Sequence, residues 1–163
     1  TSISAFPQPF GAVSPEDSER HTVAESTTRP VVLDVCCGAG TLGLVLARQS
    51  GFSQVLGVES CAPAVEDARL NARTNGLADI ATFVCGPAEL KIEELLQDLK
   101  QKQQPGSEAE VIAIVDPPRT GLKPSVCAAL RAQPSIRRVL FVSCNPHGHN
   151  MRFDYTVKVR AKC

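Results

Sequence analysis

Four side chains with acidic or nucleophilic groups lie in or directly after short apolar runs of this sequence. Cys144 stands in Ser-Cys-Asn-Pro, where a proline-fixed turn would present its thiol. A thiolate is a strong nucleophile near neutral pH once its pKa is lowered. Three carboxylates also lie in or directly after such apolar runs: Asp34, Glu59 and Asp116. Carboxylates at these positions can orient hydroxyl or ammonium groups of a ligand. The sequence therefore predicts one site made of a thiol and three carboxylates.

Residues 38–43 read Gly-Ala-Gly-Thr-Leu-Gly, the G-x-G-x-x-G pattern of loops that bind nucleotide cofactors. Glu59 follows about twenty residues later, where a carboxylate accepts hydrogen bonds from ribose hydroxyls. The pattern itself fits either a nicotinamide dinucleotide or S-adenosylmethionine. Asp34 favours S-adenosylmethionine, because a carboxylate beside the loop would repel a pyrophosphate and attract a sulfonium with its ammonium group.

Each of these assignments has a structural alternative. Asp34 could cap the loop without touching a ligand, and Asp116 with its two prolines could form a plain turn. Only Cys144 combines a strand end, a turn and a neighbouring cofactor motif. The other cysteines are predicted to be inert buried thiols (Cys36, Cys37, Cys61, Cys85 and Cys127) or an exposed terminal thiol (Cys163). No Cys-x-x-Cys pair occurs, so no metal site is expected.

The elements that must position these residues alternate between strands and helices. Apolar runs predict strands at 31–35, 54–58, 80–85, 111–115 and 138–143, and helical spacing predicts helices at 41–50, 62–75, 88–100 and 123–132. In the third helix, Leu90, Leu95, Leu96 and Leu99 are expected on the buried side. Such alternation predicts an α/β fold, a Rossmann-like sheet with a parallel core, whose carboxyl strand ends gather the site residues on one rim.

Composition limits the class of protein further. The chain has 163 residues, 43% of them apolar, with 17 basic and 17 acidic residues, which fits one globular domain. It has no apolar stretch of membrane-spanning length and no secretory pattern, so we expect a soluble protein in a reducing intracellular compartment, cytosol or nucleus. Residues 131–163 carry seven bases and one acid, a balance of +6 that predicts contact with RNA or, alternatively, a solvated surface without a partner.

Five motifs in order resemble the RNA uracil-5-methyltransferase family: LDVCCGAGT (33–41), VLGVE (55–59), AVEDARLNA (64–72), DPPRTGL (116–122) and VSCNP (142–146). The resemblance implies transfer of a methyl group from S-adenosylmethionine to carbon 5 of uridine in RNA, tRNA above all. Cys144 matches the catalytic nucleophile that adds to carbon 6 of uracil. The residues that match the cofactor site are Asp34, Gly38, Gly40, Glu59 and Asp116.

Composition and the extent of the resemblance together divide the chain into three parts: a flexible leader (1–30), an S-adenosylmethionine-dependent methyltransferase domain (31–146) and a divergent basic tail (147–163). Within the tail, residues 153–159 alternate like a strand and would pair antiparallel, because only about nine residues separate them from the fifth strand. With these last strands departing from the family pattern, we expect a sheet that is incomplete at its C-terminal side.

The tail does not match the segment that carries the family's proton-abstracting glutamate. Asp154 is its only acid, and His147 and His149 are either candidate bases or solvated loop residues. We therefore expect impaired turnover in this chain, with a noncatalytic cofactor- or RNA-binding fragment as the alternative. A third interpretation is an amino-group methyltransferase. Enzymes of that class do not need a cysteine such as Cys144, and they usually have an aromatic residue at the position that Arg119 occupies here.

Overall fold

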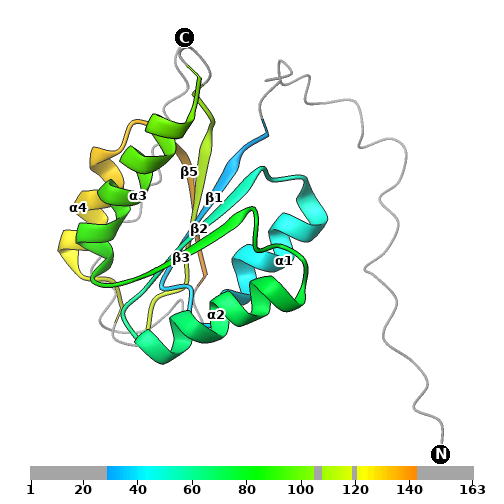
Figure 1. Cartoon of the computed structure of the whole chain (residues 1–163). Coiled ribbons are helices and arrows are strands. Elements are labelled where there is room, and N and C mark those ends of the chain that lie inside the picture. The colour runs from blue at the N-terminus through cyan, green and yellow to red at the C-terminus, as the bar shows by residue number, and fades with distance from the viewer. Residues whose placement is uncertain (1–28, 105–107, 119–120, 143–163) are drawn as a thin grey trace, which may run out of the picture.

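The structure, a computed structural model, describes residues 29–104, 108–118 and 121–142, along which strands and helices alternate (Figure 1). The strands are β1 (Val31–Val35), β2 (Gln54–Glu59), β3 (Ala81–Cys85), β4 (Val111–Val115) and β5 (Ile136–Phe141). The helices are α1 (Thr41–Ser50), α2 (Ala62–Thr74), α3 (Ala88–Lys102) and α4 (Pro124–Ala132). Every pair of neighbouring strands is parallel, in the order β3-β2-β1-β4-β5. The predicted α/β fold with a parallel core is confirmed.

Two layers of helices cover the sheet (Figure 1). Helices α1 and α2 pack on one face, where Leu44 and Val65 meet Phe83 of β3. Helices α3 and α4 pack on the other face, where Ile92 and Val126 join the main core. Because β1 lies in the middle of the sheet beneath both layers, all five of its residues are buried. The ends of the central strands are therefore held rigidly, which suits them to position a site.

The prediction for the third helix was wrong at one residue. Leu90 is 66% exposed, and Ile92 takes its place in the core. The buried positions of α3 are Ile92, Leu95, Leu96 and Leu99, which follow the i, i+3, i+4, i+7 spacing of one helical face. Leu90 stands two residues before Ile92, and a helix turns roughly 200° over two residues, so the side chain points to the opposite face.

Two cysteines predicted to be buried are exposed. Cys61 is the N-cap residue of α2, and Cys85 ends the edge strand β3, so neither lies under a helix layer. Cys36, Cys37 and Cys127 are at least half-buried. All five of these described cysteines are free thiols.

Strand β5 begins two residues earlier than predicted. Its register against β4 shifts between Val111, which pairs with Ile136, and Ile112, which pairs with Arg138. The extra residue is Arg137, and two consecutive arginines hide the strand pattern in the sequence. Beyond Phe141 only Val142 is described, so Cys144, the tail and the predicted strand at 153–159 lie outside the described residues.

The start of β1 is anchored by residues that the sequence assigned to the leader. The Ser53 backbone N–H donates to the carbonyl of Pro30 at 2.9 Å, and the Ser53 hydroxyl donates to that of Arg29 at 3.0 Å. These contacts tie both residues to the entrance of β2. The rest of the predicted leader, residues 1–28, lies outside the described residues.

Candidate active site

The loop between β1 and α1 is built largely from left-handed backbone. Cys36, Gly38 and Gly40 have φ values of 63°, 53° and 77°. Glycine adopts such angles readily, whereas a cysteine does so at an energetic cost. The Gly40 N–H donates to the Cys37 carbonyl at 2.8 Å, and the Cys37 N–H donates to that of Val58 on β2 at 3.1 Å. The predicted glycines therefore set the path of this loop.

Side chains of β3 and α2 hold the glycine loop in place. A Cβ atom added to Gly40 would lie 2.8 Å from Cζ of Phe83, so a larger residue at this position would force the packed Phe83 ring to move. The side-chain amide of Asn71 on α2 donates to the carbonyl of Ala39 at 3.0 Å. The loop is thus held by close packing against Phe83 and by a hydrogen bond from Asn71 of α2.

Glu59 lies at the end of β2 and joins the glycine loop to the start of α2. One carboxylate oxygen accepts the N–H of Gly38 at 3.1 Å. The other accepts the N–H groups of Ser60 and Cys61, at 2.8 and 2.9 Å, and the Ser60 hydroxyl at 3.2 Å. Burial acts to raise the pKa of Glu59, but these hydrogen bonds outweigh it and hold the pKa below its ordinary value. The carboxylate is therefore charged and fixed in place.

Asp34 is buried in β1 with only 1% of its surface exposed. Its Oδ2 accepts the N–H of Gly43 in the first turn of α1 at 2.9 Å, while Oδ1 has no hydrogen-bond partner within the described part of the chain. Burial raises the pKa of Asp34 to about 6, against the effect of the Gly43 N–H and with the help of the charges of Asp116 and Glu59. Asp34 thus makes the loop-capping contact that the sequence analysis gave as an alternative. Its Oδ1 makes no hydrogen bond within the described residues.

Three carboxylates act together on the thiol of Cys36. Burial, followed by the charges of Glu59, Asp116 and Asp34, raises the pKa of Cys36 to about 11. The thiol is therefore protonated near neutral pH and unsuited to nucleophilic attack. Residues from β1, β2 and β4 create a negative potential at one rim of the sheet, and such a potential favours a cationic ligand.

Asp116 leaves β4 at this rim. Its N–H donates to the carbonyl of Val35 at the end of β1, at 3.2 Å, and its side chain is exposed. Strand β5 reaches the same rim, since the Val142 N–H donates to the carbonyl of Val115 at 2.9 Å. Cys144 follows two positions later in the sequence, outside the described residues, so its distance from the carboxylates stays a prediction.

A cavity of about 520 Å³ opens between this rim and the first turns of α3 and α4. Its lining residues are Cys36, Val58, Glu59, Ser60, Gly86, Pro87, Ala88, Glu89, Asp116, Pro117, Pro118, Gly121, Leu122, Lys123 and Val126. Of the predicted cofactor residues, Glu59 and Asp116 line it directly. Asp34, Gly38 and Gly40 are not among its lining residues, although Gly38 contacts the Glu59 carboxylate. The volume lies within the usual range for small-molecule and cofactor sites.

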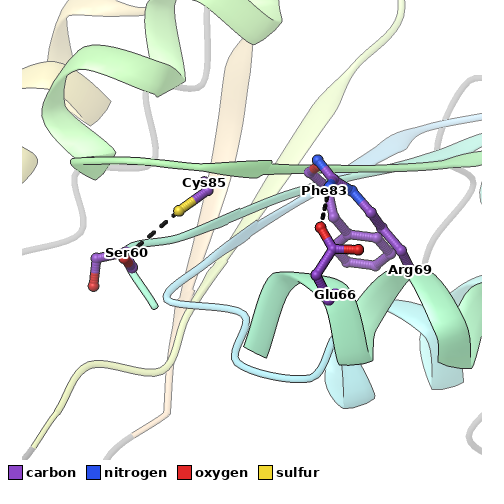
Figure 2. A network of polar contacts seen from close by, with 5 residues as sticks. All are labelled: Ser60, Glu66, Arg69, Phe83 and Cys85. Atoms are coloured by element: carbon purple, nitrogen blue, oxygen red, sulfur yellow. Dashed lines mark hydrogen bonds and ion pairs between the residues drawn. The ribbon is translucent and has the colours of Figure 1, made fainter. Parts of the chain in front are cut away.

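Polar contacts tie β3 to α2 and to Ser60, the residue after β2 (Figure 2). The Cys85 thiol donates to the carbonyl of Ser60 at 3.6 Å. Arg69 on α2 donates to the carbonyl of Phe83 at 2.9 Å and pairs with Glu66 one turn earlier on the same helix. The edge strand β3 is thereby fixed against α2, so the ring of Phe83 stays beneath the glycine loop.

Sequence reasoning missed the contribution of the third strand. Residues 86–89, directly after β3, line the cavity and include the half-buried carboxylate of Glu89. The signal was present, because Glu89 follows a predicted strand by a few residues and parallel strands share one carboxyl rim. Lys123, just before α4, adds a cation to the lining. It was missed because it lies beyond the Asp-Pro-Pro turn, at the edge of a predicted helix.

The described basic residues of the C-terminal part lie away from this rim. Arg131 is in the last turn of α4, and Arg137 and Arg138 are at the start of β5. The Arg138 guanidinium pairs with Glu110, just before β4, at 3.1 Å. In a parallel sheet the strand starts lie opposite the strand ends, so these arginines do not surround the cavity.

Residues 29–104, 108–118 and 121–142 contain no group of three or more His, Cys, Asp and Glu side chains arranged to hold a metal ion. None of the helices found there is long and apolar enough to cross a membrane.

The fold and the site together define a class of protein. A parallel sheet with this strand order, a glycine loop after β1, an acid at the end of β2 and a cavity across the strand ends make a Rossmann-like domain of the kind that binds nucleotide cofactors. A sequence profile described as tRNA (Uracil-5-)-methyltransferase matches residues 2–159. The chain belongs to the tRNA (uracil-5-)-methyltransferase family.

Individual relatives agree with this assignment. The chain is 47% identical over 116 residues to tRNA (uracil-5-)-methyltransferase homolog A of Homo sapiens, covering 71% of this chain and 17% of that protein. It is 38% identical over 152 residues to homolog B of Danio rerio, covering 90% of this chain and 30% of that protein. It thus spans less than a third of the length of either relative.

Among solved structures, one similar chain is an RNA methyltransferase from Salinibacter ruber in complex with S-adenosyl-L-homocysteine. The two are 28% identical, with a TM-score of 0.41 over 63% of this chain and 54% of that chain.

Proposed function

We propose that this chain binds S-adenosylmethionine in the cavity at the rim of the sheet and acts in methylation of carbon 5 of uridine in RNA, with tRNA as the substrate class. One observation carries the proposal: carboxylates from three strands repel one another around a glycine loop beside a cavity of cofactor size. A ligand that is a sulfonium and an ammonium ion at once would relieve that repulsion.

The residues present fit this cofactor. Glu59 lies where ribose hydroxyls can donate to its carboxylate, which is already charged and fixed. Asp116 lines the cavity beside the loop and can accept a hydrogen bond from an ammonium group. Asp34 adds negative charge from behind the loop, and Gly38 and Gly40 let the backbone approach a ligand closely. The bound cofactor would supply an electrophilic methyl group.

Cys144 would make the substrate reactive. Its thiolate adds to carbon 6 of uracil, and the electron pair of the 5,6 double bond moves onto carbon 5 and the neighbouring carbonyl oxygen. Carbon 5 would then attack the methyl group of the bound cofactor, with the methyl–sulfur bond breaking and S-adenosylhomocysteine leaving. Removal of the proton from carbon 5 by a base restores the double bond, and the thiolate leaves. The target base must leave its stack to reach such a rim.

Calorimetry and adduct trapping test the proposal. The chain is titrated with S-adenosylmethionine, and separately incubated with this cofactor and a tRNA containing 5-fluorouridine. A fluorine on carbon 5 cannot leave as a proton does, so the thiolate adduct persists and is seen as a shifted band on a denaturing gel. We expect binding, and an adduct with the wild type that Cys144→Ser abolishes.

The control variant is Cys61→Ser, which removes an exposed thiol at the N-cap of α2. It should leave the adduct unchanged. Absence of cofactor binding would refute the proposed site. Cofactor binding without any adduct would refute the proposed chemistry and support the noncatalytic binding fragment instead.

A further inference from the structure

Two exposed thiols stand on neighbouring elements at the rim of the sheet. Cys85 is the last residue of β3, and Cys61 is the N-cap residue of α2. Both are exposed, whereas the other described cysteines are half-buried or buried. Burial and nearby carboxylates raise the pKa of Cys36 to about 11 and that of Cys37 to about 12, which keeps both thiols protonated. Among the described residues, the accessible thiols are therefore Cys61 and Cys85.

The register of the sheet brings these two cysteines together. Cys85 pairs with Glu59, the last residue of the parallel strand β2. Side chains alternate along β3, so Cys85 points to the same face as Phe83, the face that α2 covers. There the Cys85 thiol donates to the carbonyl of Ser60 at 3.6 Å (Figure 2). That carbonyl belongs to the peptide bond between Ser60 and Cys61, so the Cys85 sulfur lies within about 6.5 Å of the Cys61 Cα.

A disulfide between the two residues requires only a small movement. In a disulfide the two Cα atoms lie roughly 4.4–6.8 Å apart. The Cys61 side chain makes no capping hydrogen bond, and the hydrogen bond from Cys85 to Ser60 is weak because a thiol is a weak donor. Residues 60–63 are all exposed, so the start of α2 can shift without disturbing a packed core.

The same segment holds the acid that we propose for the cofactor ribose. The Glu59 Oε1 atom accepts the N–H of Ser60 at 2.8 Å and that of Cys61 at 2.9 Å, and Ser60 lines the cavity. A bond that draws Cys61 toward Cys85 moves these N–H groups relative to the carboxylate. Glu59 then loses donors that fix its orientation, and the ribose loses a well-placed acceptor.

We propose that Cys61 and Cys85 form a site of reversible oxidation, where a disulfide weakens binding of the cofactor. The effect on the cofactor rests on the proposed function, whereas formation of the disulfide does not. The oxidant is a hydroperoxide such as hydrogen peroxide. One thiolate attacks the O–O bond and becomes a sulfenic acid, and the other thiolate attacks that sulfur and displaces hydroxide. The two thiols lose two protons and two electrons, and hydrogen peroxide becomes two molecules of water. An excess of a small thiol reverses the reaction by exchange.

The first measurement locates the bond. The 163-residue chain is treated with hydrogen peroxide, its remaining thiols are alkylated in denaturant, and it is digested with trypsin without reduction. Trypsin places Cys61 and Cys85 in the peptides 49–69 and 74–91, and neither peptide holds another cysteine. We expect mass spectrometry to show these two peptides joined, and to show them separate after reduction. The matched control is Cys127→Ser, which removes a half-buried thiol of α4 and should keep the joined pair.

The second measurement is calorimetric titration with S-adenosylhomocysteine before and after oxidation. We expect the oxidised wild type to bind about tenfold more weakly, the effect of losing one hydrogen bond to a charged group. A thiol reductant should restore the affinity. Cys85→Ser cannot form this disulfide, so its affinity should be the same before and after treatment with peroxide.

The possible outcomes separate the inference from the proposed function. Absence of the joined peptides, or a disulfide from Cys61 or Cys85 to a different cysteine, overturns the inference and leaves the proposed function standing. Joined peptides with unchanged affinity overturn the effect on the cofactor. An equal loss of affinity in oxidised Cys85→Ser does the same, because it assigns the loss to another residue. Failure of the reduced wild type to bind the ligand refutes the proposed function, while the peptide map still tests the disulfide.

Discussion

Replacement of the buried acid Asp34 by asparagine should change how stability depends on pH. Burial raises the pKa of Asp34 from 3.8 to about 6, a shift of about two units or roughly 3 kcal/mol. Because the folded state binds this proton more tightly than the unfolded state, ionisation of Asp34 costs stability above pH 6, and acidification recovers it. From pH 7.5 to 4.5 the recovery through this group is about 2 kcal/mol.

The assay is urea unfolding of the wild type and of Asp34→Asn at four pH values between 4.5 and 7.5. The variant lacks the titrating group, so its free energy of unfolding relative to the wild type should fall by about 2 kcal/mol on acidification. Glu59, whose pKa is lowered, loses stabilisation as the pH falls, but it does so in both proteins. Asp67→Asn, at an exposed position of α2, is the matched control and should track the wild type.

A difference between wild type and Asp34→Asn that stays constant over this pH range would refute the reasoning. It would mean that the carboxylate is as easily ionised in the folded chain as in the unfolded one. The same variant should bind S-adenosylmethionine more weakly at neutral pH, since one of the three negative charges at the rim is lost.

Two pairs of substitutions test the packing by urea unfolding. Gly40→Ala should cost about 3 kcal/mol, because it adds a clash with Phe83 to an unfavourable φ of 77°. Gly38→Ala should cost only about 1 kcal/mol, since its Cβ would meet open space; equal costs would contradict the packing argument. Ile92→Ala should cost about 2–5 kcal/mol and Leu90→Ala less than about 0.5 kcal/mol. The reverse order would restore the sequence-based assignment of the helix face.

The errors in the sequence analysis have specific physical origins. Counting leucines in the third helix placed Leu90 in the core, although the helical period selects Ile92 and excludes a residue two positions away. Two arginines obscured the start of β5, because a strand at the edge of the described sheet can carry charged side chains at exposed positions. Cys85 was predicted to be buried because cysteines usually are, whereas its place on an edge strand exposes it.

The order of strands and helices, the parallel sheet and the glycine loop could all be read from the sequence. They depend on local periodicity and on turn residues, which act over a few positions. The chain order also predicted that Asp34, Glu59 and Asp116 belong to one rim.

Only the tertiary structure decided how these acids differ. Asp34 is buried behind the loop, Glu59 accepts four hydrogen bonds from Gly38, Ser60 and Cys61, and Asp116 is exposed at the cavity wall. It also decided that Glu89 lines the same cavity as Glu59 and Asp116. Burial and hydrogen bonding arise from contacts between residues far apart in the chain. Such contacts set the pKa and the accessibility of each carboxylate, and no local pattern carries that information.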